Sequence, residues 1–475
     1  MTCVRGISKR SHSVRNDKWC AHCILGTTLI ALLVFPHRVF ADDNHYQNYL
    51  LGERAVGLGG AFTAISDDSS GAFYNPAGLA ETPHSSLSLS AAMYGFSSRS
   101  SSINTSSPIE GNDSTFISYP TTTAWIQRVR KGNEDGSGRI QLAVSLFTPY
   151  SDVWRTRWAY SMGLPSPAPN RERKLDVVEV TLAEDDTIWL GASFAWKIWK
   201  WVSIGATVFG TLRTGVYHFH GLYIRSLWTD GVIDDALTLA RRTELKFRHW
   251  GLLGVVGLQF RITEELRLGL SFRTPQYAIS GTGDLNVLTM NGELDPQPEL
   301  QIESIGLDAT FQERQPFKAT LGVAYLRPRD FGLSLDFSVY GTTSQYPVLK
   351  FTYEGKQEEL FPTKKKVTIQ VNWGGEYYLW ERVPLRLGFF TNLSSLDPVT
   401  TCTILDPDCV GASPFEDGMD RFGLSGAIGY EFDHATLNLG VSYNIGFDSA
   451  KSIQNFELDT RRSFLFLMIG GSFRF

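Results

Sequence analysis

The chain has 475 residues, with 44 Lys and Arg against 49 Asp and Glu, which gives a formal net charge of −5. Because there is no basic excess, the composition argues against nucleic acid as a partner. Hydrophobic residues make up 43% of the chain and aromatic residues 13%, which excludes a disordered protein. A mean hydropathy of −0.12 excludes a multi-pass helical membrane protein. It leaves room for a membrane β-barrel, whose strands alternate apolar with polar residues.

The first 41 residues have the pattern of a secretory signal peptide. Five basic residues precede an apolar run over 24–35, and Val39-Phe40-Ala41 follows as a candidate cleavage site. The run is shorter than the ~20 residues that a membrane-spanning helix needs. We therefore predict that residues 1–41 are removed, with an uncleaved anchor as the alternative. Cleavage leaves 38 basic and 48 acidic residues, a net charge of −10, so the sequence predicts an exported, acidic protein.

Cleavage also removes three of the five cysteines and leaves Cys402 and Cys409. These two lie in a loop-like stretch, and in an oxidising compartment their spacing predicts a Cys402–Cys409 disulfide. A zinc site would need two more ligands nearby, and none is present; His218 and His220 form only a lone pair. We expect no metal and no cofactor.

From residue 85 onward, apolar residues alternate with polar or small ones over about ten residues at a time. Val202, Ile204, Ala206 and Val208 alternate in this way with Ser203, Gly205 and Thr207. A period of two indicates β-strands with one apolar and one polar face. The pattern predicts fourteen strands, the first over 85–97 and the last over 462–475.

Two kinds of connection separate these predicted strands. Short ones, such as 263–265 and 433–434, alternate with long ones, predicted over 151–186, 215–244, 285–316 and 393–420. Outer-membrane barrels have short periplasmic turns and long external loops. The sequence therefore predicts an all-β fold, a transmembrane antiparallel barrel over residues 85–475, in the outer membrane of a diderm bacterium and in contact with its lipid.

Residues 42–84 are rich in Gly and Ala and lack strand alternation. A barrel of about fourteen strands is too wide to be filled by its own side chains. We therefore expect this segment to form a small hatch, or plug, in the lumen. At the other end, the last strand finishes on Phe475, which is typical of the signal that the barrel-assembly machinery recognises.

Three stretches resemble one known family. Ala55 to Asp68 followed by Asn75-Pro-Ala-Gly-Leu79, the segment 145–150, and the segment 268–275 are similar to the long-chain fatty acid and aromatic hydrocarbon transporters of the outer membrane. The resemblance implies passive uptake of a hydrophobic small molecule that external loops capture and a movement of the hatch releases. The hatch residues that it assigns to gating are Gly57, Gly59, Gly60, Asp67, Asp68, Asn75, Pro76 and Ala77. The cysteine pair is a departure from the family.

The residues themselves support this implication in part. Pro149 removes a hydrogen-bond donor from the third strand, so we expect a kink there; the resemblance implies a lateral opening beside it. Trp154 and Trp158 belong to an unusually apolar stretch of the predicted loop over 151–186, which is typical of a binding surface. Leu253, Val255, Phe464 and Phe466 fall on the inward face, where they suit a lipid tail.

A carboxylate head group needs a cation, and the inward candidates are Arg213, Arg273 and Arg386. The alternative is that these arginines pair with inward acids such as Asp336 or Glu431 and only stabilise the lumen. A general porin, or a secretion-associated or structural barrel with a similar hatch, remains an alternative function. No Ser, His and acid set stands out, so we do not expect an enzyme.

Overall fold

The structure is a computed structural model that describes residues 45–82, 84–104, 109–164, 170–293, 299–395, 419–451 and 457–475. These residues all belong to one compact unit, residues 41–475. The predicted signal peptide, residues 1–41, and the predicted Cys402–Cys409 disulfide lie outside the described residues, and both stay predictions.

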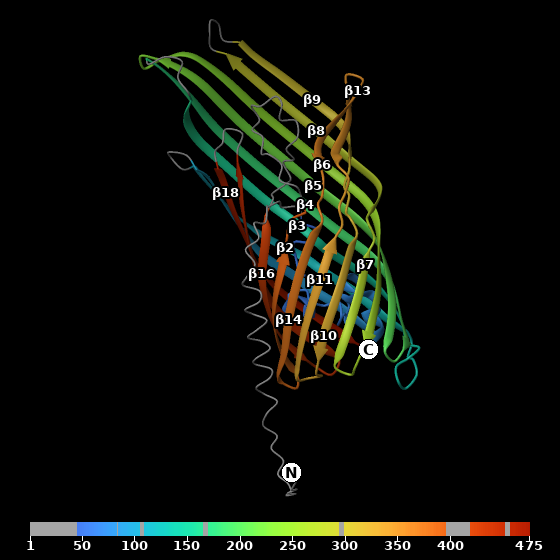
Figure 1. Ribbon diagram of the computed structural model, residues 1–475. Helices are drawn as coiled ribbons and strands as arrows, with labels where there is room; N and C mark the ends of the chain where they lie inside the picture. Colours follow the sequence, from blue (N-terminus) through green and yellow to red (C-terminus); the bar gives the residue numbers. More distant parts are fainter. Residues whose placement is uncertain are drawn as a thin grey trace, which may run out of the picture. The chain divides into compact units, whose positions relative to one another are not determined.

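Fourteen antiparallel strands form a closed wall, because β1 pairs both with β2 and with β18 (Figure 1). The predicted barrel of about fourteen strands is thus confirmed. The wall strands follow one another around the barrel in chain order: β1 (Ser86–Asn104), β2 (Ile109–Arg130), β3 (Ile140–Leu164), β4 (Arg171–Trp199), β5 (Val202–Thr229), β6 (Val232–Arg261), β7 (Leu266–Arg273), β10 (Lys318–Leu326), β11 (Phe331–Tyr340), β14 (Thr368–Trp380), β15 (Val383–Asn392), β16 (Asp420–Glu431), β17 (Ala435–Lys451) and β18 (Glu457–Arg474).

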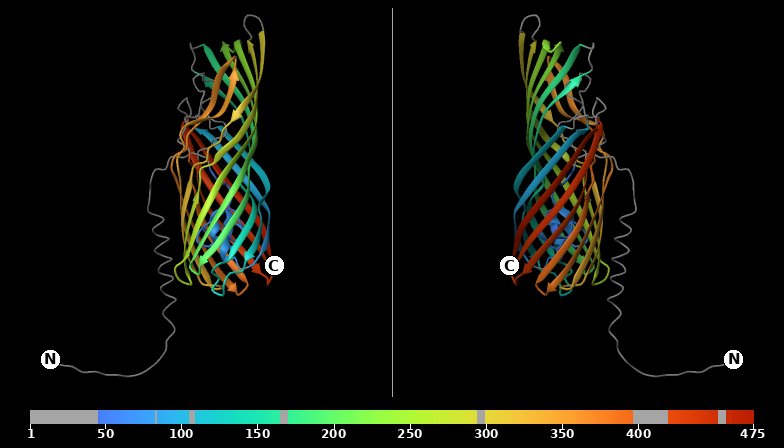
Figure 2. Two further views of the ribbon diagram at one scale, coloured as in Figure 1. Left: turned by 90° about the vertical axis from the view of Figure 1, so that its right-hand side faces the viewer. Right: turned by 90° about the vertical axis from the view of Figure 1, so that its left-hand side faces the viewer.

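Four further strands extend one side of the wall: β8 (Tyr277–Glu293), β9 (Glu299–Phe311), β12 (Tyr346–Tyr353) and β13 (Lys356–Thr363). β8 continues the line of β7 along β6, and β9 pairs with β8. β12 then pairs with β9 and β13. Together with the long strands β3 to β6, they form a tall sheet above the rest of the barrel, which Figure 2 shows from two sides.

This tall sheet corrects the prediction of long loops over 151–186, 215–244 and 285–316, because most of these residues lie in strands. β6 has 30 residues, whereas a transmembrane strand needs about 9–11. The period of two does not reveal the extension, because its exposed residues mix charged ones, such as Glu184 and Lys246, with apolar ones, such as Val180. The short connections predicted at 263–265 and 433–434 are confirmed as the turns between β6 and β7 and between β16 and β17.

The two faces of the lower wall differ as the alternation predicts. Outward side chains are apolar and exposed, among them Leu190 at 59%, Val208 at 60% and Leu424 at 63%. Inward neighbours such as Ser193 and Thr207 are polar and buried. An apolar outer surface with every wall strand paired on both sides suits the hydrocarbon layer of a membrane. No helix among the described residues is long and apolar enough to cross a membrane.

Residues 45–82 occupy the lumen as the hatch. They form the short helices α2 (Glu53–Gly57) and α3 (Gly71–Tyr74) and the 3₁₀ helix η1 (Pro76–Glu81). The apolar hatch residues Leu51, Leu58, Phe62, Ile65 and Leu79 are buried in one cluster with the wall residues Phe147, Trp189 and Phe209. These hatch side chains pack on one another and on the wall, so the hatch and the wall share one core.

Candidate functional site

The hatch is seated on the wall through Asn75, which is fully buried. Its amide Nδ2 donates to the carbonyl oxygens of Thr63, 2.8 Å away, and of Leu258 on β6, 3.0 Å away. Its Oδ1 accepts from the backbone N–H of Ala77 at the start of η1. Asn75 therefore holds two turns of the hatch together and fixes both to one strand of the wall.

The wall approaches the hatch backbone closely only because it carries glycine at the contact points. A Cβ at Gly257 would lie 1.9 Å from Asn75 Oδ1, and one at Gly205 would lie 2.3 Å from the carbonyl carbon of Pro76. On the opposite side of the barrel, a Cβ at Gly388 would lie 2.0 Å from the backbone nitrogen of Gly59. Side chains at these wall positions would displace the hatch.

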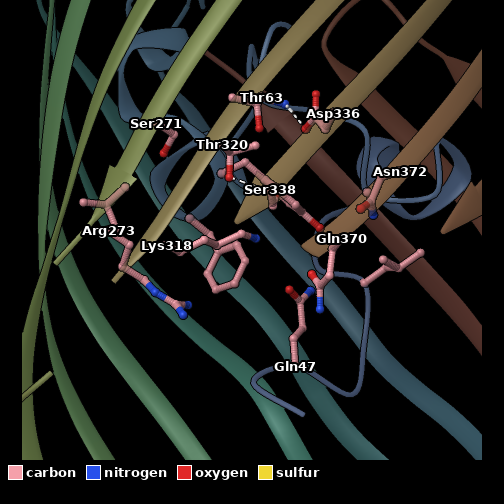
Figure 3. A pocket seen from close by; sticks show the side chains of 15 residues that line it. Gln47, Thr63, Ser271, Arg273, Lys318, Thr320, Asp336, Ser338, Gln370 and Asn372 are labelled. Carbon is pink, nitrogen blue, oxygen red and sulfur yellow. Dashed lines mark hydrogen bonds between the residues drawn. The ribbon is translucent and has the colours of Figure 1, made fainter. Parts of the chain in front are cut away.

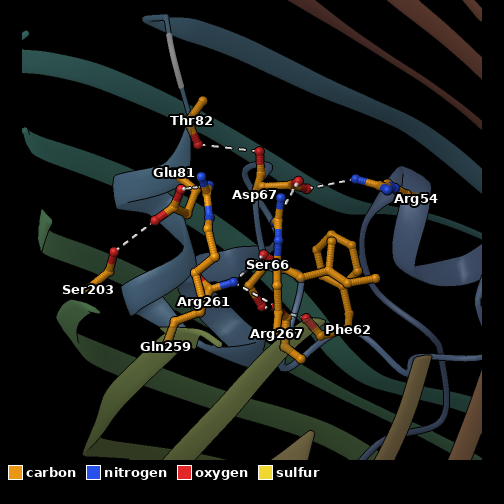
Figure 4. A network of polar contacts seen from close by, with 12 residues as sticks. Arg54, Phe62, Ser66, Asp67, Glu81, Thr82, Ser203, Gln259, Arg261 and Arg267 are labelled. Carbon is orange, nitrogen blue, oxygen red and sulfur yellow. Dashed lines mark hydrogen bonds and ion pairs between the residues drawn. The ribbon is translucent and has the colours of Figure 1, made fainter. Parts of the chain in front are cut away.

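Ion pairs anchor the hatch at further points (Figure 4). Arg54 binds Asp67, with Nη1 2.8 Å from Oδ1, and also binds Glu376 on β14. At the other end, Glu81 accepts from Lys197 on β4 at 2.8 Å and from Arg261 on β6 at 2.6 Å. Sequence reasoning singled out Asp67 but missed Arg54, Glu81 and the wall residues that pair with them. Those partners are distant in sequence, so only the closed fold brings them together.

The remaining hatch residues of the prediction lie at turns and contacts. Gly59 and Gly60 have φ values of +62° and +76°, a conformation that favours glycine. Gly57 faces the side chains of Arg386 and Ala427 with no room for a Cβ. Asp68 Oδ1 accepts from the backbone N–H of Ser70, 2.8 Å away, just before α3. They are structural parts of the hatch, and their role in gating stays a prediction.

The three predicted head-group arginines have different surroundings. Arg213 donates to Asp185, with Nε 2.9 Å from Oδ1, and its Nη1 lies 3.2 Å from Glu313 Oε1. Arg386 binds Glu376 at 2.5 Å and Asn438 at 2.7 Å. Arg213 and Arg386 therefore pair with inward acids, as the alternative expects, but these acids are not Asp336 or Glu431. Asp336 instead accepts the backbone N–H groups of Phe62 and Thr63 in the hatch, and Glu431 accepts from the Tyr378 hydroxyl.

Arg273 is different, because no acid pairs with it among the described residues. It is 6% exposed, and its Nε and Nη2 have no hydrogen-bond partner in the described part of the chain. Its guanidinium lies 5.3 Å from the ring centre of Trp189 and 5.4 Å from that of Tyr340. Arg273 is the last residue of β7, and Pro275 stands in the gap before β8, where it cannot donate to the ladder.

A small cavity lies beside Arg273, between the wall and the hatch (Figure 3). Lys318 adds a second cation, with Nζ 5.0 Å from the ring centre of Tyr340. The space available to water-sized molecules is about 40 Å³. The hatch supplies one side of the lining and the barrel the other: Gln47, Leu50, Gly60, Thr63, Phe73 and Tyr74 from the hatch, and Val255, Ser271, Arg273, Lys318, Thr320, Asp336, Ser338, Gln370 and Asn372 from the wall.

Apolar side chains line the lumen above and beside this cavity. Leu253 and Val255 are buried in the cluster that includes Phe73 of the hatch. Phe464 and Phe466 pack on Tyr49, with the rings of Tyr49 and Phe466 4.9 Å apart. Higher up, the wall strands β4, β5 and β6 and the added strands β8, β9 and β12 form a separate cluster, here called the upper apolar cluster. Its members are Ala183, Tyr217, Phe219, Leu245, Phe247, Leu285, Phe311 and Leu349, with Trp154 packed against it. Trp154 and Trp158 lie on strand β3 and not on a loop.

The predicted kink at Pro149 is a bulge in β3. The β3–β4 register shifts by one residue between Phe147 and Tyr150. On the other side of β3, the pairing with β2 ends at Thr122 and Phe147. Above this point the two strands continue but are bonded only to their other neighbours, β1 and β4. We call this unpaired boundary the β2–β3 seam.

The carboxyl-terminal end of the chain closes the wall. β18 ends at Arg474, and the N–H of Phe475 donates to the carbonyl oxygen of Ser85, 3.0 Å away. The Phe475 side chain is 65% exposed on the outside of the barrel. Its role as an assembly signal stays a prediction.

No protein-family model and no curated protein sequence matches the chain. Among solved structures, it is similar to a FadL homologue from Pseudomonas aeruginosa, with a TM-score of 0.58, 13% identity and coverage of 91% of this chain and 100% of the other. The toluene transporter TodX of Pseudomonas putida matches with a TM-score of 0.57, 12% identity and coverage of 89% and 97%. The toluene transporter TbuX of Ralstonia pickettii matches with a TM-score of 0.52, 13% identity and coverage of 90% and 99%. The chain therefore has the fold of this FadL homologue and these toluene transporters, which confirms, for the fold, the resemblance carried by the hatch motif.

Proposed function

We propose that the protein carries hydrophobic molecules passively across the outer membrane of a diderm bacterium, and that long-chain fatty acids are its substrate class. The observation that carries the proposal is Arg273, a buried guanidinium without a paired acid in a lumen lined by apolar side chains. A buried cation is costly unless an anion compensates it. A fatty acid brings both a carboxylate for Arg273 and Lys318 and a tail for the apolar lining.

In this proposal the substrate first binds the upper apolar cluster, including Trp154, and then passes Leu253 and Val255 to reach Arg273. The cavity beside Arg273 holds about 40 Å³, which is room for very few water molecules and not for an acyl chain. Because six of its lining residues belong to the hatch, a shift of the hatch enlarges it. Loss of the Asn75 contacts to Thr63 and Leu258 is the first step of such a shift.

The proposed exit is sideways through the β2–β3 seam next to Pro149, into the membrane. This route suits a substrate that partitions into lipid. The proposal includes three parts of the chain: a signal peptide over 1–41 that is removed, a hatch over 42–84 and a barrel over 85–475 whose terminal Phe475 addresses it to the assembly machinery.

The test measures the uptake of palmitate, a fatty acid, and of hexadecane, a neutral hydrocarbon of equal chain length. The cells carry this chain as their only outer-membrane protein for the uptake of hydrophobic compounds. Arg273→Met removes the cation and keeps an apolar side chain of similar length. A charge-assisted hydrogen bond contributes about 1.5–3 kcal/mol, so palmitate uptake should fall about tenfold or more. Hexadecane uptake should stay within about twofold of the wild-type value, because it makes no such bond.

The matched control is Arg382→Gln, which removes an exposed arginine paired with Asp433 at a turn; it should leave both uptakes unchanged. Equal uptake of palmitate by Arg273→Met and wild type would contradict the head-group assignment. Two results together would favour the secretion-associated role: uptake of both compounds that is unchanged when the gene is deleted, and a partner protein that always co-purifies with the chain. A large, steady conductance in planar bilayers would favour a general porin.

A further inference from the structure

The β2–β3 seam begins where a proline stands on each of the two facing strands. The last paired residues are Thr122 on β2 and Phe147 on β3. If the same register continued, Pro120 would lie opposite Pro149, and neither has an N–H to donate. Pro149 was predicted to kink the wall, whereas its counterpart Pro120 was missed. The two prolines together explain why the ladder stops at this point and not elsewhere.

Above the prolines, side-chain contacts take the place of the backbone ladder. Arg462 on β18 binds Asp152 on β3 through two hydrogen bonds, Nη1 to Oδ2 at 2.8 Å and Nη2 to Oδ1. The Arg99 guanidinium on β1 lies 5.2 Å from the ring centre of Trp154 on β3. The backbone N–H of Arg155 also donates to Asp113 Oδ2 on β2, 3.0 Å away.

The Arg462–Asp152 pair is the strongest of these contacts. Both side chains are buried, at 1% and 5% exposure, and the geometry is bidentate. Arg462 reaches β3 from inside the lumen past β1 and β2, and its Nε contacts Ser97 Oγ on β1 at 3.4 Å. It therefore ties both sides of the seam together from within. Removing Asp152 breaks both of these hydrogen bonds, and removing Arg462 takes the bidentate partner from the buried Asp152 carboxylate, so the pair holds the seam only while both are present.

The hatch contacts the same place. Asn48 donates its backbone N–H to the carbonyl oxygen of Pro149, 3.0 Å away, and its side chain donates to that of Ser151, 3.3 Å away. Asn48 Oδ1 in turn accepts from Arg421 on β16, 3.0 Å away. The first residues of the hatch thus bind carbonyl groups of β3 directly beside Asp152, so a displacement of the hatch removes support from the seam.

We propose that the Arg462–Asp152 pair is a latch that keeps the β2–β3 seam closed between transport events, and that Asn48 couples this latch to the hatch. The inference rests on the proposed lateral release and deepens it, because it names the residues that regulate the exit. Displacement of the hatch frees the Pro149 and Ser151 carbonyls, and the latch then holds the seam without the support of Asn48.

The first experiment measures the latch without any substrate. Asp152→Asn removes one charge of the pair, and amide hydrogen exchange is followed in β3 over residues 150–164. Exchange should become at least about fivefold faster than in wild type, whereas the charge-swapped double variant Asp152→Arg with Arg462→Asp should restore slow exchange. The control Glu359→Gln breaks the exposed pair with Lys350 on the β12–β13 hairpin and should leave β3 unchanged. If the amide exchange rate of β3 in Asp152→Asn equals that in wild type, the latch proposal is wrong.

The second experiment locks the seam in the full barrel. Asp113→Cys with Arg155→Cys, in a chain whose Cys402 and Cys409 are serine, is joined across the seam by a flexible bis-maleimide reagent that contains a reducible disulfide. Cross-linking should lower palmitate uptake about tenfold or more, and a reductant should restore it. The control cross-link, Ala192→Cys with Val208→Cys, joins outward residues of the paired strands β4 and β5 and should have no effect.

These outcomes separate the two proposals. If wild-type chain takes up no palmitate, the proposed function fails, while the exchange measurement still decides on the latch. If wild type transports palmitate and the locked seam transports it equally well, lateral release through this seam is wrong. Variants that fail to assemble are recognised by the loss of heat-modifiable migration, and Arg462→Lys, which keeps the charge but not the bidentate geometry, then takes the place of Asp152→Asn.

Discussion

Glu53 is a hatch carboxyl whose protonation state is set by its surroundings. It lies at the start of α2 and accepts from Asn438 Nδ2 on β17, 2.9 Å away, while its Oε1 has no partner among the described residues. Burial raises the pKa of Glu53 from its ordinary value of 4.5 to about 7, and the nearby Asp68 adds to the rise, whereas Arg386 lowers it. The docked hatch therefore favours the protonated form of this carboxyl.

The raised pKa predicts that hatch docking weakens as the pH rises from about 4.5 to about 7. In that window the displaced hatch loses the Glu53 proton before the docked hatch does, so ionisation favours displacement; above the folded pKa no further change is expected. Amide exchange of residues 48–60, corrected for intrinsic rates, should be about tenfold faster at pH 8 than at pH 4.5. Glu53→Gln should remove most of this difference, and Glu264→Gln, at an exposed turn, should retain it. A pH-independent wild type contradicts the prediction.

Sequence could name the three inward arginines but not rank them. Their inward phase follows from the period of two, and all three point into the barrel. Whether each has an acid depends on strands far away in sequence: Asp185 and Glu313 reach Arg213, and Glu376 reaches Arg386. Nothing in the sequence around Arg273 indicates that no acidic side chain pairs with it among the described residues. Only the closed barrel therefore distinguishes Arg273 from the other two candidates for the head-group site.

At the scale of elements, the hatch and the wall fit because glycines of the wall leave room for the hatch backbone. Gly257 on β6 shows this most clearly, since a Cβ there would overlap Asn75 Oδ1. Gly210 on the neighbouring strand β5 offers a natural comparison, because the nearest atom to its Cβ position is 4.0 Å away. Both are strand glycines, so their intrinsic effects on the strand are similar.

We expect Gly257→Ala to unseat the hatch and Gly210→Ala to leave it in place. Displacement of Asn75 loses its bonds to Thr63 and Leu258, which contribute about 0.5–1.5 kcal/mol each. Amide exchange over residues 48–82 should accelerate about tenfold in Gly257→Ala, while heat-modifiable migration of the barrel stays as in wild type. Equal exchange in the two variants contradicts the seat at Asn75.

The strands themselves were predicted well near the membrane and poorly above it. In the lower wall the apolar face is continuous, so alternation is easy to recognise, as in Val202 to Val208. In the extension the outward face mixes charged residues with apolar ones such as Val180 and Leu222, so the residues of 151–186 and 215–244 contrast less between the two faces. They remain strands because neighbouring backbones supply the hydrogen bonds, for example Asp176 opposite Ile224. Pairing between strands, and not side-chain pattern, decides the structure there.

At the scale of the whole molecule, closure of the wall does not depend on the hatch. The first and last strands pair from Ser86 opposite Arg474 to Asn104 opposite Glu457. The hatch contacts the inside through many side chains, such as Arg54 with Glu376, and through apolar packing, and none of these contacts belongs to the strand ladder. A wall of fourteen strands encloses more space than its own side chains fill. We therefore expect the wall to stay closed without the hatch and the hatch to act as the barrier.

Deletion of residues 42–60 should consequently leave an assembled but leaky barrel. The deletion removes α2 and its contacts to Glu376 and Asn438, yet leaves the pairing of every wall strand intact. We expect heat-modifiable migration as in wild type and at least about tenfold higher entry of small hydrophilic solutes, measured as single-channel conductance in planar bilayers. Gly210→Ala should conduct as little as wild type. If the variant without residues 42–60 does not form a closed barrel, the hatch is needed for assembly. If its barrel closes but stays impermeable, another part of the lumen forms the barrier.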